Sequence, residues 1–243
     1  MNDLTINDNI NPLDIVNNLN NDEEAIKRAK EAAAPKWIPQ LNVAYGSSKS
    51  VNEDKIARPG DFVLGGGVCL GSKIEAVVLS FRDRASIIDS KNNYKTVESA
   101  YVVKGSSEED TKAFTAFLKK EKELPSYQKI DSGIEFFLFI PEQNSFCTLW
   151  CKRTLTSSVP ALINAGLGRL VSISTVFVKS KNNFYVLDVR PTLRALKGSN
   201  LNFEGITLEK DIVLPADLFN KYYNMFIKPP KVLKDAEEEE VER

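Results

Sequence analysis

The chain has 243 residues, of which 42% are hydrophobic and 27% charged, and its formal net charge is −1. This composition is typical of a globular protein of one domain, and no segment approaches the roughly 18 apolar residues that a membrane-spanning helix requires. The sequence contains no histidine, which excludes Ser-His-Asp and Cys-His catalysis and most transition-metal sites.

An enzyme that uses carboxylates and Mg²⁺, such as a nuclease, stays open on composition alone. Such a site needs acids that converge in space, and no acidic motif stands out in the predicted core. We therefore expect a protein without enzymatic activity, without a cofactor, without a bound metal and without a membrane partner.

Both ends of the chain are acidic, whereas the middle is basic. Residues 1–34 contain seven acids and three bases, and residues 235–243 contain six acids and one base. Residues 35–234 have a net charge of +8. Acidic ends can simply maintain solubility. Alternatively, a basic surface binds a polyanion, and the acidic tail competes for that surface or recruits partners.

The first residues are rich in Asn and Asp, and helix formers follow over 21–34, which predicts a loosely attached acidic arm. The N-terminal segment has neither the basic region nor the continuous apolar region of a signal peptide. We expect a cytoplasmic protein.

The first part of the body predicts short strands joined by turns. Residues 37–46 are strand-like, and 47–61 are predicted as a loop that ends in a Pro-Gly-Asp turn. Three glycines occupy 65–67. A phosphate-binding loop needs Lys and then Ser or Thr after its last glycine, followed by a helix, but a strand-like run over 72–89 follows here. The glycines are therefore predicted to form a turn or a close approach between strands.

The second part of the body contains the clearest helix, over 106–125. Ser107 and Asp110 predict a capping box at its start, and Pro125 ends it. The other predicted elements are a strand over 94–105, two strands within 134–155, a short helix over 158–168, a hairpin over 169–191 and a helix over 214–230. Many short strands with a few helices indicate a β-barrel or β-sandwich core.

The chain has three cysteines and no CxxC motif. Cys147 and Cys151 are four residues apart on a predicted strand, about 13 Å at the usual rise, which is too far for a disulfide. We expect all three cysteines, Cys69 included, to be buried, reduced thiols.

Aromatic and basic residues alternate on several predicted strands, as in the segments SFRDR, LWCKR and VFVKSKNNFYVLDVR. Single-stranded nucleic acid is bound in this way, because cations follow the phosphates and rings stack on unpaired bases. The alternative is that the rings form the core of a β protein and that the cations lie at solvated strand edges.

The layout resembles the single-stranded-DNA-binding proteins of tailed bacteriophages. The resemblance rests on RPGDF (58–62), the strand that ends in VVLSFRDR (77–84), the hairpin over 171–191 and the acidic tail. It implies a mainly β (α+β) fold, namely an OB-like antiparallel barrel with inserted helices and a C-terminal helix. It also implies sequence-independent binding of single-stranded DNA in replication or recombination, in the cytoplasm of the host cell.

The prediction divides the chain into an acidic arm (1–34), one OB-like domain (35–230) and an acidic tail (231–243). The candidate nucleic-acid contacts are Lys73, Phe81, Arg82, Arg84, Tyr94, Trp150, Lys152, Arg153, Lys179, Lys181, Tyr185 and Arg190. The candidate partner-binding residues, expected to recruit replication or recombination proteins, are Asp235, Glu237, Glu238, Glu239 and Glu240. A homo-oligomer is left open. The alternative function is a structural or assembly protein of a phage particle, which would use the β core for protein–protein contacts.

Overall fold

The computed structural model describes residues 37–65, 67–179, 183–192, 207–209 and 212–228. A compact unit of the chain begins at Trp37, close to the predicted boundary at residue 35. The predicted arm over 1–34 and the tail over 231–243 lie outside the described residues. Within the described part, no helix is both long and apolar enough to cross a membrane.

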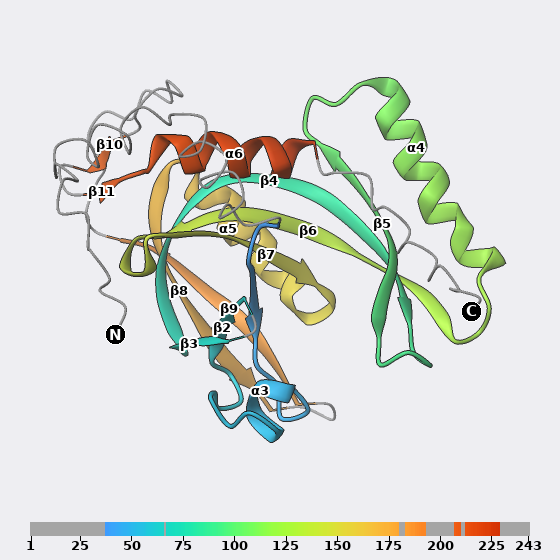
Figure 1. Ribbon diagram of the computed structural model, residues 1–243, viewed down its shortest axis with the longest axis horizontal. Helices are drawn as coiled ribbons and strands as arrows, with labels where there is room; N and C mark the ends of the chain where they lie inside the picture. The colour runs from blue at the N-terminus through green and yellow to red at the C-terminus, as the bar shows by residue number, and fades with distance from the viewer. Residues whose placement is uncertain (1–36, 66, 180–182, 193–206, 210–211, 229–243) are drawn as a thin grey trace, which may run out of the picture. The chain divides into compact units, whose positions relative to one another are not determined.

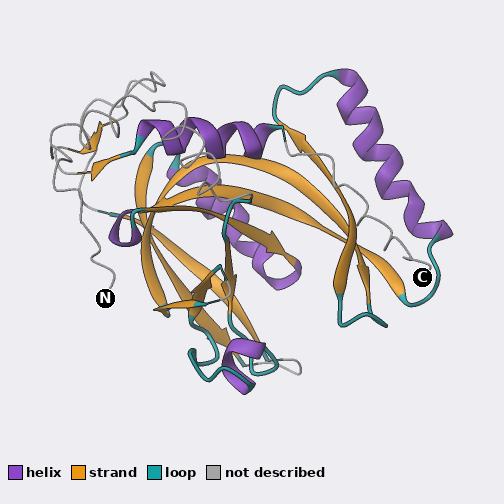
Figure 2. Cartoon of the chain, in the orientation of Figure 1, coloured by secondary structure: helices purple, strands orange, loops and turns teal. Residues whose placement is uncertain are grey.

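The described strands form one large curled sheet and one small sheet (Figure 2). The large sheet has the order β3-β2-β1-β7-β6-β4-β8-β9, and β5 pairs with β4 beside this path. Its strands are β1 (Gln40–Val43), β2 (Phe62–Leu64), β3 (Val68–Gly71), β4 (Lys73–Asp89), β5 (Lys95–Val103), β6 (Gln128–Ile140), β7 (Ser145–Lys152), β8 (Arg169–Val178) and β9 (Phe184–Pro191). The small sheet pairs β10 (Thr207–Glu209) with β11 (Ile212–Val213).

The helices lie between or after these strands (Figure 1). They are α3 (Lys49–Asn52), α4 (Glu108–Lys119), α5 (Val159–Ala165) and α6 (Ala216–Ile227), together with the 3₁₀ segments η1 (Lys120–Glu123), η2 (Pro141–Gln143) and η3 (Arg153–Ser158). The predicted fold class, mainly β with inserted helices and a C-terminal helix, is confirmed. The sheet is mixed, because β1 pairs parallel to β7, and it curls into a half-barrel.

Five neighbouring strands of the large sheet have the order β7-β6-β4-β8-β9, and α5 lies between β7 and β8 in the chain. This path is compatible with an OB-like barrel. The hydroxyl of Ser158 in η3 accepts a hydrogen bond from the backbone N–H of Leu187 and donates one to its carbonyl, at 2.9 and 3.1 Å. The segment after β7 therefore satisfies backbone groups of β9, which pairs on one side only with β8.

The long strand β4 changes its neighbour along its length. It pairs with β6 over most of its residues, with β8 over Lys73 to Val78, and with β5 from Arg82 onward. A register shift between Val78 and Ser80 marks the change. Residues 82–89 of β4 pair with β5 on one side and with residues 128–135 of β6 on the other. We call this three-stranded extension of the sheet the wing.

The apolar run of β6 is buried on both faces of the sheet. Phe136, Leu138 and Ile140 belong to the cluster inside the half-barrel, whereas Phe137 and Phe139 belong to a second cluster on the opposite face. Successive side chains of a strand point to opposite faces, so a continuous apolar run is required where both faces are covered.

Two helices cover the sheet on opposite faces. On the outer face, α6 contributes Phe219, Tyr222 and Phe226 to the second cluster, along β4 and β6 (Figure 1). On the opposite face, which is the face of the barrel core, Phe117 of α4 packs against the wing. The predicted capping box of α4, between Ser107 and Asp110, is confirmed.

Two sequence predictions about the early strands have different outcomes. The predicted glycine turn is confirmed, because Gly65, with a φ of 58°, lies in the connection between β2 and β3. The loop over 47–61 contains the short helix α3, which the sequence analysis did not predict. Gly60, with a φ of 96°, lies so close to the ring of Tyr185 that a Cβ would come within 2.7 Å of it.

The prediction for the cysteines is only partly correct. Cys147 and Cys151 are buried free thiols, and burial raises the pKa of Cys151 to about 12. Cys69 is exposed, because β3 is an edge strand whose residues contact little beyond β2. Its thiol lies 3.6 Å from a carboxylate oxygen of Asp61.

Candidate nucleic-acid interface

The outer face of the sheet carries a row of charged residues beside the cluster under α6. The register pairs Arg82 with Glu135, and Glu135 with Trp150 on the next strand. Residues two positions further along each strand lie on the same face. The predicted contacts Arg82 and Arg84 on β4 therefore lie on the same face as Trp150 and Lys152 on β7, with β6 between them. The sequence of each strand alone does not show this neighbourhood.

Glu135 is the buried centre of the first ion-pair group. Its carboxylate accepts from Arg82 at 2.7 Å and from Arg84 at 2.5 Å, and its side chain is 2% exposed. Arg82 also donates to the backbone carbonyl of Phe226 at the end of α6, and its guanidinium lies 4.2 Å from the Phe226 ring centroid.

The structure thus gives Arg82 a structural role, in place of the phosphate contact that we expected. Burial lowers its pKa, and the charge of Glu135 counteracts this effect. A cation at a helix C-terminus interacts favourably with the unpaired carbonyls there. Arg82 therefore secures the last turn of α6 on the sheet.

Asp131 is the centre of a second, more open group. Its carboxylate accepts from Lys152 at 3.1 Å and, in bidentate geometry, from Nε and Nη2 of Arg153 at 3.1 and 2.8 Å. Burial alone would raise the pKa of Asp131, but the hydrogen bonds and charges of the two cations outweigh it and lower that pKa. The Arg153 side chain is 52% exposed. Two cations that reach the surface thus share one buried carboxylate, which leaves positive charge available to an anion.

Trp150 lies between the two groups. The guanidinium of Arg84 and the ammonium of Lys152 are 4.1 and 4.0 Å from its ring centroid. The residue is 7% exposed, and its indole N–H has no acceptor among the described residues.

A groove of about 510 Å³ runs between the end of β1 and the end of β7. We call it the β7 groove. It is lined by Trp150, Lys152 and Arg153, which the sequence predicted, and by Tyr45 and Phe184, which it did not include among the candidate contacts. Leu41, Leu149 and Leu155 provide apolar lining, and Ser47, Ser48 and Thr154 provide hydroxyl groups. Three aromatic residues and two cations thus surround one hollow.

The signals for the two missed aromatic residues were present but weak. Tyr45 follows a short strand and precedes a glycine, and Phe184 follows the predicted turn of the hairpin. Tyr45 has no basic residue beside it. Phe184 lies in the alternating segment VFVKSKNNFYVLDVR, but its neighbour Tyr185 was included among the candidate contacts instead. They reach the groove from segments more than a hundred residues apart.

The β8–β9 hairpin places two more predicted contacts near this groove. Tyr185 is half-buried and contacts Tyr45 at 5.7 Å between ring centroids and Phe177 at 5.4 Å. Lys179 is exposed just after β8. Lys181 lies outside the described residues.

The remaining predicted contacts do not line the β7 groove. Lys73 is exposed at the start of β4, and Tyr94, 65% exposed, follows its other end. Arg190 is exposed and pairs with Asp188 at 2.8 Å. Phe81 is half-buried and packs on the core beside Phe136. The predicted tail residues lie outside the described part of the chain: Asp235, Glu237, Glu238, Glu239 and Glu240.

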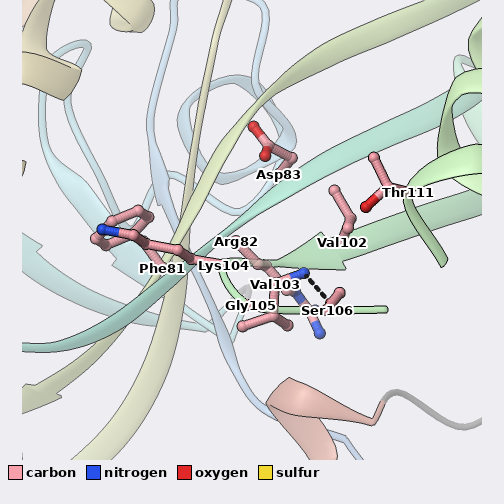
Figure 3. A pocket seen from close by; sticks show the side chains of 9 residues that line it. All are labelled: Phe81, Arg82, Asp83, Val102, Val103, Lys104, Gly105, Ser106 and Thr111. Carbon is pink, nitrogen blue, oxygen red and sulfur yellow. Dashed lines mark hydrogen bonds between the residues drawn. The ribbon is translucent and has the colours of Figure 1, made fainter. Parts of the chain in front are cut away.

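A second hollow of about 350 Å³ lies where β4 changes its neighbour to β5 (Figure 3). It is lined by Phe81, Arg82 and Asp83 and by the turn after β5, where the N–H of Val103 donates to the hydroxyl of Ser106 at 3.1 Å. Burial raises the pKa of Asp83. Because an acid lines this hollow and Arg82 is already paired with Glu135, the β7 groove suits a polyanion better.

The described residues contain no group of three or more acidic or cysteine side chains that could hold a metal ion. A comparison of the chain with family models, with curated proteins and with solved structures finds no match in any of the three.

Proposed function

We propose that this protein binds single-stranded DNA without sequence preference and acts in phage DNA replication or recombination. The observation that carries the proposal is the β7 groove, where three aromatic residues and two surface cations meet on a strand of an OB-like path. The strands and loops of such barrels commonly bind oligonucleotides.

The proposed chemistry divides the lining between phosphates and bases. Lys152 and Arg153 contact the phosphates and exchange part of their pairing with Asp131 for pairing with the strand. Tyr45 and Phe184 offer aromatic surface to unpaired bases, an interaction worth roughly 1–3 kcal/mol per base. Since neither interaction reads a base edge, all sequences bind alike. In the same proposal, the acidic tail over 235–243 recruits replication or recombination proteins.

The first test is a fluorescence-anisotropy titration with a labelled oligo-dT at two salt concentrations. The double variant Lys152→Ala/Arg153→Ala is expected to bind about tenfold or more weakly, because it loses two charge-assisted contacts. The slope of log affinity against log salt is expected to become shallower by about 1.4, or about 0.7 for each lost phosphate contact.

The matched control is Lys112→Ala/Lys119→Ala, which removes the same charge from two exposed residues of α4. It is expected to retain wild-type affinity and slope. Equal losses in both double variants would mean that only net charge matters. No binding of oligo-dT by the wild type at low salt would refute the proposed function.

A further inference from the structure

The indole N–H of Trp150 is a buried donor whose partner is missing from the described residues. The side chain is 7% exposed, and the Nε1 atom has no hydrogen-bond acceptor there. A buried donor without an acceptor costs free energy, and buried tryptophans usually have a partner for this group. Since Trp150 lines the β7 groove, a ligand in that groove is a source for the missing acceptor.

The ring of Trp150, one of the nucleic-acid contacts predicted from the sequence, is poorly suited to stack on a base. The cations of Arg84 and Lys152 lie over the ring at 4.1 and 4.0 Å, and little of the ring is exposed. Stacking would require both a free ring face and removal of a cation. The two other aromatic residues of the groove, Tyr45 and Phe184, are only half-buried.

We propose that the indole N–H of Trp150 donates a hydrogen bond to a phosphodiester oxygen of the bound strand, so that this residue contacts the backbone rather than a base. The inference rests on the proposed function and deepens it by assigning one lining residue. The ligand atom is anionic because Lys152 and Arg153 follow Trp150 closely in the chain and line the same groove.

The nearby carboxylates do not take the role of the acceptor. Glu135 is opposite Trp150 in the register, but its two oxygens accept from Arg82 and Arg84. Asp131 accepts from Lys152 and Arg153. The ammonium of Lys152, whose side chain is 31% exposed, lies 4.0 Å from the centroid of the Trp150 ring. A phosphate that attracts Lys152 away from the ring therefore also opens a path to the N–H group.

The variant Trp150→Phe removes the N–H donor and retains an aromatic ring under the two cations. We expect its affinity for oligo-dT to fall by about 10- to 150-fold, the usual range for one hydrogen bond to a charged group. The salt slope is expected to stay unchanged, because the lost donor is neutral. The thermal midpoint confirms that the variant is folded, and Trp37→Phe, which alters a tryptophan that is 71% exposed, is the control.

A second probe distinguishes a phosphate from a base. The same titrations use an abasic deoxyribose-phosphate oligomer of equal length, which has phosphates but no bases. The affinity ratio between wild type and Trp150→Phe is expected to be the same for both oligomers. A ratio that falls to one with the abasic oligomer would assign the contact to a base and overturn the inference.

Nuclear magnetic resonance then observes the donor directly. The chain has two tryptophans, so the Trp37→Phe variant has a single indole N–H resonance. We expect this resonance to move downfield when either oligomer is added. A resonance that stays in place while anisotropy shows binding refutes the inference and leaves the proposed function standing. If anisotropy shows no binding to begin with, both fail.

Discussion

At the scale of single residues, the two carboxylates Glu135 and Asp131 do similar chemistry in different surroundings. Each accepts from two cations, but Glu135 is paired with Arg82 and Arg84 at buried positions, whereas Asp131 is paired with cations that reach the surface. Loss of one partner of a buried ion pair leaves an uncompensated charge and costs about 3–5 kcal/mol. Glu135 therefore serves stability, and Asp131 can exchange its partners for a ligand.

The variant Asp131→Asn tests the role of Asp131 by two expected effects, a loss of stability and a gain in affinity for DNA. The folded-state pKa of Asp131 lies below its ordinary value, so this carboxylate stabilises the fold above that value and loses its effect as the pH falls through the folded-state pKa. Wild type is expected to be more stable than the variant at neutral pH, and the difference is expected to shrink as the pH falls below the ordinary carboxyl pKa of 3.8 and through the lowered folded-state pKa. Denaturant unfolding at several pH values measures it.

The same variant is expected to bind oligo-dT more tightly, because Lys152 and Arg153 lose their internal competitor. The matched control is Asp188→Asn, whose partner Arg190 is exposed, and which is expected to change neither stability nor affinity appreciably. Weaker binding by Asp131→Asn would show that this carboxylate positions the two cations for the ligand rather than competing with it.

At the scale of elements, α6 is the part of the fold that depends most on aromatic packing. The Phe226 ring is fully buried and stacks on Phe137 at 5.3 Å between centroids. Its backbone carbonyl is held by Arg82. The helix is thus joined to the sheet by apolar contacts along its length and by a cation at its end.

Truncation of this ring is expected to destabilise the protein substantially. Phe226→Ala should lower the free energy of unfolding by about 3–5 kcal/mol, the usual cost of a buried phenylalanine. Leu218→Ala, on the same helix but 39% exposed, should cost about 0.5 kcal/mol or less. Denaturant titration compares the two. Similar small losses would mean that α6 is not stably packed on the sheet.

The elements with local signals were predictable from the sequence. The capping box of α4, the long run of β4 and the strands around the turn at 141–144 follow from capping, β-branched residues and turn residues. The short strands β1 to β3 were predicted as strands, and β2 pairs with its neighbours β1 and β3. The parallel pairing of β1 with β7, which lies about a hundred residues later in the chain, has no local signal.

At the scale of the whole β unit, the candidate site depends on contacts between distant segments. The β7 groove joins residues 41–48, residues 149–155 and Phe184. Composition and alternation indicated Trp150, Lys152 and Arg153, but could not indicate which cations the fold would use internally. Arg82 has the same sequence signal as Arg84 and is engaged with the end of α6. The pairing of β4 with β6 brings both arginines to Glu135, and the position of α6 gives Arg82 its additional contact.

The measurement that tests the central claim most directly is photo-crosslinking to an oligomer that carries iodo-deoxyuridine, followed by mapping of the modified peptides. We expect crosslinks at Tyr45 or Phe184, and we expect them to be lost in Lys152→Ala/Arg153→Ala. Crosslinks confined to the wing, for example at the exposed Tyr94, would contradict it, because that surface lies outside the β7 groove.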